Sequence, residues 1–118
     1  SPAQGCAREA LEETAHPFKP TALVGVYLSR FQRPATQEDI TYLRFAFTGV
    51  LGEHDPHRAL DDGIVRTLWM GIDEMLTCQE KHRSRLLVRC AQDHARGVRF
   101  PLDAVYTDPS VYRPGGPA

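Results

Sequence analysis

The sequence lacks the features that mark several large classes of protein. Its 118 residues include three cysteines and no Cys-x-x-Cys pair, which argues against a disulfide framework or a zinc ribbon and favours a reducing cytoplasm. No apolar run approaches the roughly 20 residues that cross a bilayer. The formal net charge is only −1, so the chain as a whole offers no field that attracts a nucleic-acid polymer or a membrane.

What the sequence does contain is the composition of one globular domain. Apolar residues make up 42% of the chain and charged residues 25%, which is ordinary for a folded protein. We expect a single domain over residues 1–106 and a flexible tail over residues 107–118, which ends in RPGGPA.

The first helix is predicted to begin almost at the first residue. Ser1 and Gln4 resemble a capping box, and the helix should end at Ala15 or His16 because Pro17 moves its predecessor out of the helical region. Small residues recur at helical spacing along this segment: Ala3, Cys6, Ala7 and Ala10. Such a face implies close approach to another element, so we expect strands upstream of Ser1 to be missing from this chain.

Strands and helices follow one another along the rest of the chain. Apolar patterning predicts strands over residues 21–27, 40–51 and 64–69, with polar loops over residues 30–39 and 52–63. Residues 99–106 should be extended. The mixture of strands and helices predicts an α+β fold.

Two further helices are expected in the second half of the chain. Asp73 should cap a short one, and a longer one over residues 84–95 should end at Gly97. The buried side of the longer helix is predicted to carry Leu86, Leu87, Cys90, Ala91 and His94.

Three glutamates cluster on the first predicted helix. Glu9, Glu12 and Glu13 stand at positions i, i+3 and i+4 of one face, where each like-charge pair costs about 0.2–0.5 kcal/mol. A hard divalent cation such as Mg²⁺ takes oxygen ligands and would turn that repulsion into attraction. The alternative is a solvated acidic first turn favoured by the helix dipole, and the spacing alone leaves both interpretations open.

The stretch REALEETA, from Arg8 to Ala15, resembles the core of the Nudix box. That pattern reads Gly, five residues, Glu, seven residues, and then Arg-Glu-apolar-x-Glu-Glu-x-Gly-apolar. Ala15 stands in place of the last glycine, and His16 in place of the apolar residue after it. Seven residues precede Arg8, so the earlier glutamate of the box is expected directly before Ser1.

The downstream sequence resembles the NudJ-type branch of the same family. The similar segments are YLRFAF, IDEM and the long stretch RSRLLVRCAQDHARGVRFPLDAVY, before which ordinary Nudix domains end. The resemblance implies a Nudix α/β/α sandwich with a mixed β-sheet, whose first strands this chain lacks. It also implies a cytoplasmic enzyme that acts as a monomer or a homodimer.

The resemblance implies a hydrolase that depends on Mg²⁺ or Mn²⁺. Its substrates would be nucleoside tri- or diphosphates, or small pyrophosphates such as thiamine pyrophosphate. By this resemblance Glu12 and Glu13 become metal ligands, and Glu9 becomes a ligand or the base that activates water. Arg8 would orient the glutamates through a salt bridge.

Three more residues are candidates for the site. Nudix sites often take a carboxylate from the loop before the third strand, and the resemblance assigns this to Asp61, although the neighbouring Asp62-Gly63 pair equally suits a turn. Arg44 suits a substrate phosphate, or equally an acid on the surface. Trp69 could stack on a ring, but large aromatic side chains are more often buried in a core.

Two other functions stay open at this point. The chain could be a noncatalytic Nudix-like module that binds a nucleotide, or an interaction domain whose acidic helix is only surface. The complete set of repelling glutamates favours the enzyme, because a binding module has no need to retain them.

Overall fold

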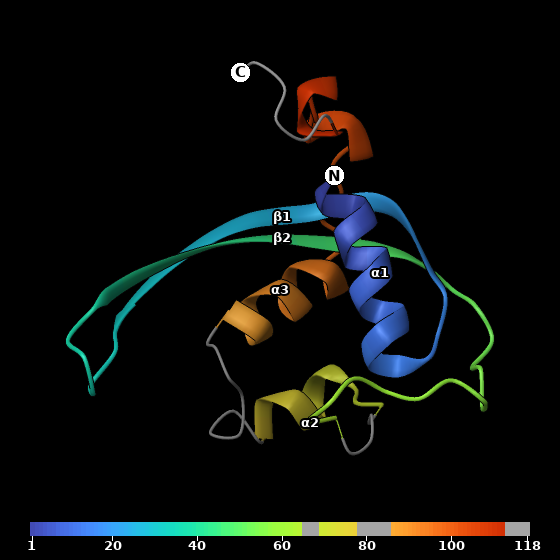
Figure 1. The fold of residues 1–118 in the computed structure, drawn as a ribbon, viewed down its shortest axis with the longest axis horizontal. Helices are drawn as coiled ribbons and strands as arrows, with labels where there is room; N and C mark the ends of the chain where they lie inside the picture. Colours follow the sequence, from blue (N-terminus) through green and yellow to red (C-terminus); the bar gives the residue numbers. More distant parts are fainter. Residues whose placement is uncertain (65–68, 78–85, 113–118) are drawn as a thin grey trace.

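The structure, a computed structural model, describes residues 1–64, 69–77 and 86–112 (Figure 1). Its elements are α1 (Pro2–Thr14), β1 (Phe18–Gln32), β2 (Asp39–Leu51), α2 (Ile72–Thr77), α3 (Leu86–Ala95) and the 3₁₀ helices η2 (Leu102–Ala104) and η3 (Pro109–Tyr112). Helices α1 and α3 both pack against β1. The predicted α+β class is confirmed. In the described residues all strand pairing is antiparallel, so the mixed sheet of the expected sandwich does not occur there.

Helix α1 begins and ends where the sequence predicts. The Ser1 hydroxyl accepts a hydrogen bond from the Gln4 amide at 3.2 Å, and the Gln4 side chain accepts one from the Ser1 amine at 3.0 Å. This capping box satisfies donors that the first helical turn leaves without partners. At the other end Ala15 takes the left-handed conformation (φ 59°) and its amide donates to the Leu11 carbonyl.

Strands β1 and β2 form one long hairpin that extends further than predicted. The pairing runs from Phe18 opposite Leu51 to Gln32 opposite Asp39. The predicted strand over residues 21–27 was therefore too short, and the loop predicted over residues 30–39 shrinks to a turn between Arg33 and Glu38. The polar residues of this stretch suggested a loop, but they pair across the two strands.

Two cross-strand contacts hold the tip of this hairpin. Arg30 and Asp39 form an ion pair of 2.9 Å, and the rings of Phe31 and Tyr42 stack with centroids 5.5 Å apart. Such pairs stabilise a two-stranded sheet even where both faces meet water.

The second half of the chain confirms some predictions and corrects others. Gly97 ends α3 with a positive φ of 81°, as expected. Helix α2 begins at Ile72, so Asp73 lies in its first turn and is not its cap. In residues 99–106 the predicted extended segment is interrupted by η2, with Phe100 bridging to Leu23 before it and Val105 extended after it. Residues 65–68 of the strand predicted over 64–69 lie outside the described residues, as do residues 113–118 of the predicted tail.

Helix α3 buries a carboxylate that the apolar pattern of the sequence did not assign to its buried side. Asp93 is 6% exposed, whereas His94, which was expected on the buried side, is exposed. His94 instead approaches the sheet by its ring, with Nε2 2.9 Å from the Thr48 hydroxyl. The prediction for His94 was wrong because α3 meets β1 and β2 through hydrogen bonds as well as through apolar contact.

The apolar core of the described residues is small. Its buried apolar members are Ala15, directly after α1, and Leu23 and Val24 on β1. Large apolar side chains along the hairpin remain exposed, among them Val26, Leu28, Leu43 and Val50. Among these residues the structure contains no helix long and apolar enough to cross a membrane.

Candidate functional site

The glutamates of the predicted site lie at the C-terminal end of α1. Because the helix starts at Pro2, Glu12 and Glu13 occupy its last turn and its first turn holds no acid. The interpretation of an acidic first turn favoured by the helix dipole is therefore wrong. The C-terminal end of a helix carries partial negative charge, so carboxylates there are disfavoured by about 0.3–1 kcal/mol each.

Little within α1 offsets this accumulation of negative charge. The one cation of α1 is Arg8, whose Nε lies 3.9 Å from Glu12, and both side chains are substantially exposed. An exposed i,i+4 pair of this kind is worth about 0.3–0.5 kcal/mol. Glu9 also acts on its neighbour Cys6: burial first, and then the charge of Glu9, raise the pKa of the Cys6 thiol.

The loop after β2 folds back onto the acidic end of α1. The Asp61 amide donates to the Glu12 carbonyl at 3.0 Å, and the Asp55 amide donates to the Ala15 carbonyl at 2.8 Å. Both bonds satisfy carbonyls that the last turn of a helix leaves without partners. The structure therefore brings the backbone of Asp61 to the helix that carries the three glutamates.

Asp61 also takes part in the turn that the sequence left open. Its carbonyl accepts a hydrogen bond from the Ile64 amide at 3.0 Å, and Gly63 between them has a φ of 89°. A turn with a positive φ at this position favours glycine or asparagine. The side chains of Asp61 and Asp62 are both exposed, so the turn and a metal-binding role for Asp61 are compatible.

The candidate ligands have the right chemistry for a hard divalent cation, but their side chains are not arranged as a metal site. Carboxylate oxygens are the ligands that Mg²⁺ and Mn²⁺ prefer, and Glu9, Glu12, Glu13 and Asp61 supply only such oxygens. Within the described residues, however, no group of three histidine, cysteine or acidic side chains is close enough to hold a metal ion. Side-chain rotation of exposed glutamates is therefore required before they can act together.

An aromatic cluster adjoins the same end of α1. The His16 ring lies 5.1 Å from that of His54 and 5.6 Å from that of Trp69, with the indole nearly perpendicular at 82°. Trp69 is 76% exposed, so the expectation that it packs in a core was wrong. The sequence offered no signal for this contact, because the three residues are far apart in the chain.

Arg44 lies with α3. It is half-buried on β2 opposite Tyr27, and its positive charge counteracts the burial that raises the pKa of the Cys90 thiol. The structure therefore places Arg44 among residues that face α3, and its role toward a substrate phosphate stays a prediction.

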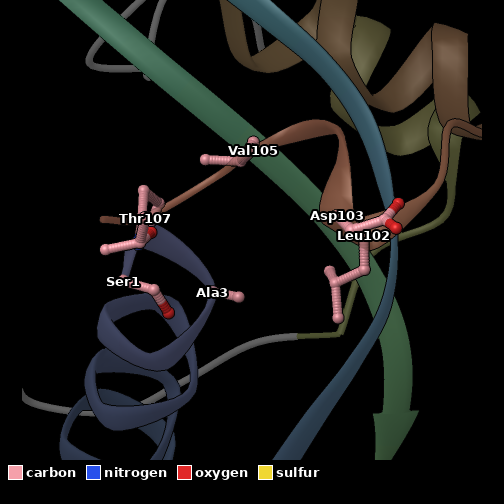
Figure 2. Close-up of a pocket in the computed structure, with 7 residues that line it drawn as sticks. Ser1, Ala3, Leu102, Asp103, Val105 and Thr107 are labelled. Atoms are coloured by element: carbon pink, nitrogen blue, oxygen red, sulfur yellow. The ribbon is translucent and has the colours of Figure 1, made fainter. Parts of the chain in front are cut away.

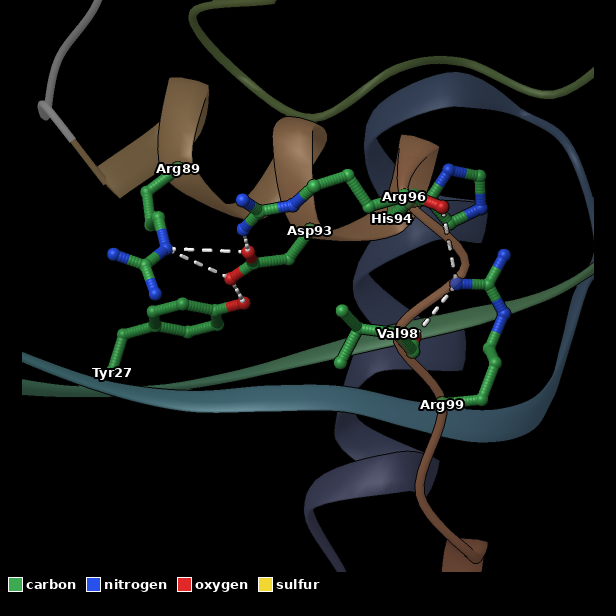
Figure 3. Close-up of polar contacts among 7 residues, drawn as sticks. All are labelled: Tyr27, Arg89, Asp93, His94, Arg96, Val98 and Arg99. Carbon is green, nitrogen blue, oxygen red and sulfur yellow. Dashed lines mark hydrogen bonds and ion pairs between the residues drawn. The ribbon is translucent and has the colours of Figure 1, made fainter.

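A polar network that sequence analysis missed joins α3 to β1 (Figure 3). The Tyr27 hydroxyl donates to Asp93 at 2.6 Å, Arg89 donates to the same carboxylate at 3.0 Å, and Arg96 donates to its other oxygen. The hydrogen bond from Tyr27, with those from Arg96 and Arg89, lowers the pKa of Asp93 to about 2 against the opposing effect of burial. Burial and the bond to Asp93 raise the pKa of Tyr27.

The spacing of this network gave a partial signal. Arg89 and Arg96 stand four residues before and three residues after Asp93, which is the spacing of ion pairs on one helical face. Nothing in the sequence joins them to Tyr27. The group belongs to the packing of α3 on the sheet.

Two pockets open away from the glutamates. One of about 330 Å³ lies between the start of α1 and the segment around η2, and Figure 2 shows Ser1, Ala3 and Leu102 on its walls. A second of about 610 Å³ lies between β1 and α3, beside the Asp93 network. Neither of these two pockets is lined by Glu9, Glu12, Glu13 or Asp61.

Comparison with known proteins identifies the class that this fold and these residues represent. The structure of a Nudix hydrolase from Nitrosomonas europaea matches 89% of this chain and 68% of its own, with 43% sequence identity and a TM-score of 0.78. No family model matches the chain, and no match was found among curated proteins.

The chain belongs to the Nudix hydrolase family. It is accordingly a hydrolase that acts on the phosphoanhydride bonds of small molecules, and members of this family generally use divalent metal ions. The predicted family and fold are confirmed by this match.

Proposed function

We propose that the chain is a Mg²⁺- or Mn²⁺-dependent pyrophosphohydrolase of the NudJ type. Its substrates would be nucleoside tri- or diphosphates, or small pyrophosphates such as thiamine pyrophosphate. The single observation that carries the proposal is the placement of Glu12 and Glu13 in the last turn of α1, where the helix dipole disfavours them. Retaining acids at such a position is reasonable if bound cations offset the repulsion.

We assign a role to each candidate residue. Glu12 and Glu13 would hold the cation, and Glu9, one helical turn earlier, would add a ligand or take the proton of the attacking water. Arg8 would orient Glu12, which it already approaches, and Asp61 would add a carboxylate from the loop bonded to Glu12. Arg44 would contact a phosphate group of the substrate. When bound, the metal ion would neutralise the diphosphate and acidify the attacking water.

The remaining parts of the proposal concern the protein as a whole. We infer one domain over residues 1–106 with a tail over residues 107–118, acting as a monomer or homodimer on small molecules. A cytoplasmic location is supported by the free thiols of Cys6 and Cys90. Nucleic-acid polymers and membranes are not expected as partners, given the net charge of −1.

Phosphate release with Mg²⁺ present is the direct test. The Glu12→Gln and Glu13→Gln variants should each lose at least about 100-fold in kcat/KM, because each removes a ligand worth several kcal/mol of transition-state stabilisation. Glu53→Gln, an exposed acid of the loop after β2, serves as the matched control and should keep wild-type turnover. Turnover that both ligand variants retain would exclude the assigned roles.

A noncatalytic nucleotide-binding module is the second candidate. It is favoured by the lack of a preassembled group of three metal-binding side chains among the described residues. Calorimetry separates the two, because a module of this kind binds adenosine diphosphate and releases it unchanged, with no phosphate formed.

A further inference from the structure

The pocket between β1 and α3 has the composition of a ligand site. Its volume of about 610 Å³ falls within the range of roughly 300–1,000 Å³ that ligand pockets occupy. Apolar side chains form most of its wall, and its charged side chains are joined in one network. The apolar lining residues are Leu23, Val24, Val26, Val98, Phe100 and Ala104. Such a pocket suits a ligand with an aliphatic body and one polar head.

Two arginines are available to bind the polar head of such a ligand. Arg89 and Arg96 both line the pocket, and their side chains are 63% and 64% exposed. Each donates to the Asp93 carboxylate through one nitrogen, Nε of Arg89 and Nη2 of Arg96 (Figure 3). A guanidinium group carries five N–H donors, so most donors of both arginines are not used by Asp93.

The charges beside the pocket match an anion with a single negative charge. The hydrogen bond from Tyr27, followed by those from Arg96 and Arg89, lowers the pKa of Asp93 to about 2, so this carboxyl group is ionised at neutral pH. Two guanidinium groups and one carboxylate leave one positive charge next to the apolar wall. A second carboxylate fits the remaining donors, because the planar guanidinium group binds carboxylates through two parallel hydrogen bonds.

We propose that this pocket binds a free aliphatic carboxylate. Its chain would lie on the apolar side chains of β1 and of the segment between α3 and η2, and its head would contact Arg89 and Arg96. The site is separate from the glutamates of α1, none of which lines this pocket. The inference therefore does not depend on the proposed function, and it gives the chain a second ligand of another chemical class.

Calorimetry with octanoate, kept below its micellar concentration, tests the site directly. Octanoate should bind saturably at one molecule per chain. Each methylene group added to the carboxylate should tighten binding by about fourfold, because more apolar surface leaves water. Octylammonium has the same chain and a positive head, and should not bind. Equal binding of octanoate and octylammonium, or no saturable binding of octanoate, would overturn the proposal.

Two substitutions on β1 form a matched pair. Val26→Asp places a negative charge on the wall of the pocket and should weaken octanoate binding at least about tenfold. Leu28→Asp makes the same change two residues further along the strand, outside the lining of the pocket, and should bind octanoate as the wild type does. Val26 and Leu28 are 50% and 70% exposed, so neither belongs to the core. Equal binding in both variants would overturn the assigned location.

The contact with the head group has a test of its own. Arg89→Gln and Arg96→Gln should each weaken octanoate binding about tenfold, because hydrogen bonds to a charged group are lost. Binding of octan-1-ol, which has no charge, should stay as in the wild type and so shows that the pocket is intact. Wild-type affinity for octanoate in both variants would overturn the role of the arginines.

The glutamate variants separate this inference from the proposed function. Glu12→Gln should bind octanoate as the wild type does, whatever its effect on hydrolysis. Loss of octanoate binding in Glu12→Gln would overturn the separate pocket. Hydrolysis without octanoate binding in the wild type would overturn this inference and leave the enzyme in place.

Discussion

Ala15 shows at the scale of one residue how this chain replaces a glycine of the Nudix box. Its φ of 59° is the left-handed conformation that glycine adopts readily, and the residue is completely buried. Alanine accepts this conformation at a cost of roughly 1–2 kcal/mol, while its buried methyl group returns about 0.8 kcal/mol. The substitution therefore preserves the end of α1 and the carbonyl of Ala15 that holds Asp55.

The first prediction concerns this position. Ala15→Val should lower the free energy of unfolding by about 2–3 kcal/mol, because a β-branched side chain is strained at positive φ and has no space there. Ala15→Gly, the matched control, should stay within about 1 kcal/mol of wild type. Urea denaturation measures both, and a valine variant as stable as wild type would contradict the conformation described here.

At the scale of elements, a buried carboxylate joins α3 to the hairpin. Asp93 on the helix accepts hydrogen bonds from Tyr27 on β1 and from two arginines of its own segment. A carboxylate in this position needs all of its partners, because a buried charge that loses one is strongly disfavoured. The junction of α3 and β1 therefore depends on the ionised form of Asp93.

The second prediction is a pH dependence of stability. Because the folded pKa of Asp93 is about 2, below its unfolded value of 3.8, its contribution is complete above pH 3.8 and is lost as the pH falls toward 2. Asp93→Asn should be less stable than wild type at pH 7, and thermal unfolding should show a smaller loss of stability on acidification. Tyr27→Phe should move the acid loss to higher pH.

Asp103→Asn is the control for this prediction, since Asp103 is exposed on η2. Its acid-induced loss of stability should follow that of the wild type. If wild type and Asp93→Asn lost the same free energy of unfolding on acidification, the ionised Asp93 would not be what holds α3 on β1.

At the scale of the whole molecule, the candidate site depends on segments distant in sequence. α1 supplies the glutamates, the loop after β2 supplies Asp61, and Trp69 arrives from beyond that loop. A ligand that binds several of these segments in the folded state alone must stabilise the folded state.

The third prediction is stabilisation by metal ions. Mg²⁺ at about 100 times its dissociation constant should stabilise the chain by about 2.7 kcal/mol, seen as a higher melting temperature. The double variant Glu12→Gln with Glu13→Gln should show no such rise, whereas Glu53→Gln should respond as the wild type does. A melting temperature of the wild type that ignores Mg²⁺ and Mn²⁺ would exclude these glutamates as a metal site.

The local features of the chain could be predicted from its sequence, and the contacts between distant segments could not. The capping box of Ser1 and Gln4 and the stop at Gly97 were predictable, because they depend on neighbours a few residues away. The length of the hairpin was underestimated, since polar residues such as Arg30 and Asp39 are stabilised by each other across the strands.

By itself the sequence determined the family, the start and end of α1, and the face on which its glutamates lie, because spacing along one helix sets which side chains are neighbours. The tertiary structure alone decided that Asp61 lies beside the end of the helix that carries these glutamates, and that Trp69 is exposed against His16. It also decided that Asp93 is buried. Burial and contact across long loops depend on how the elements pack, and the order of residues along the chain does not fix that packing.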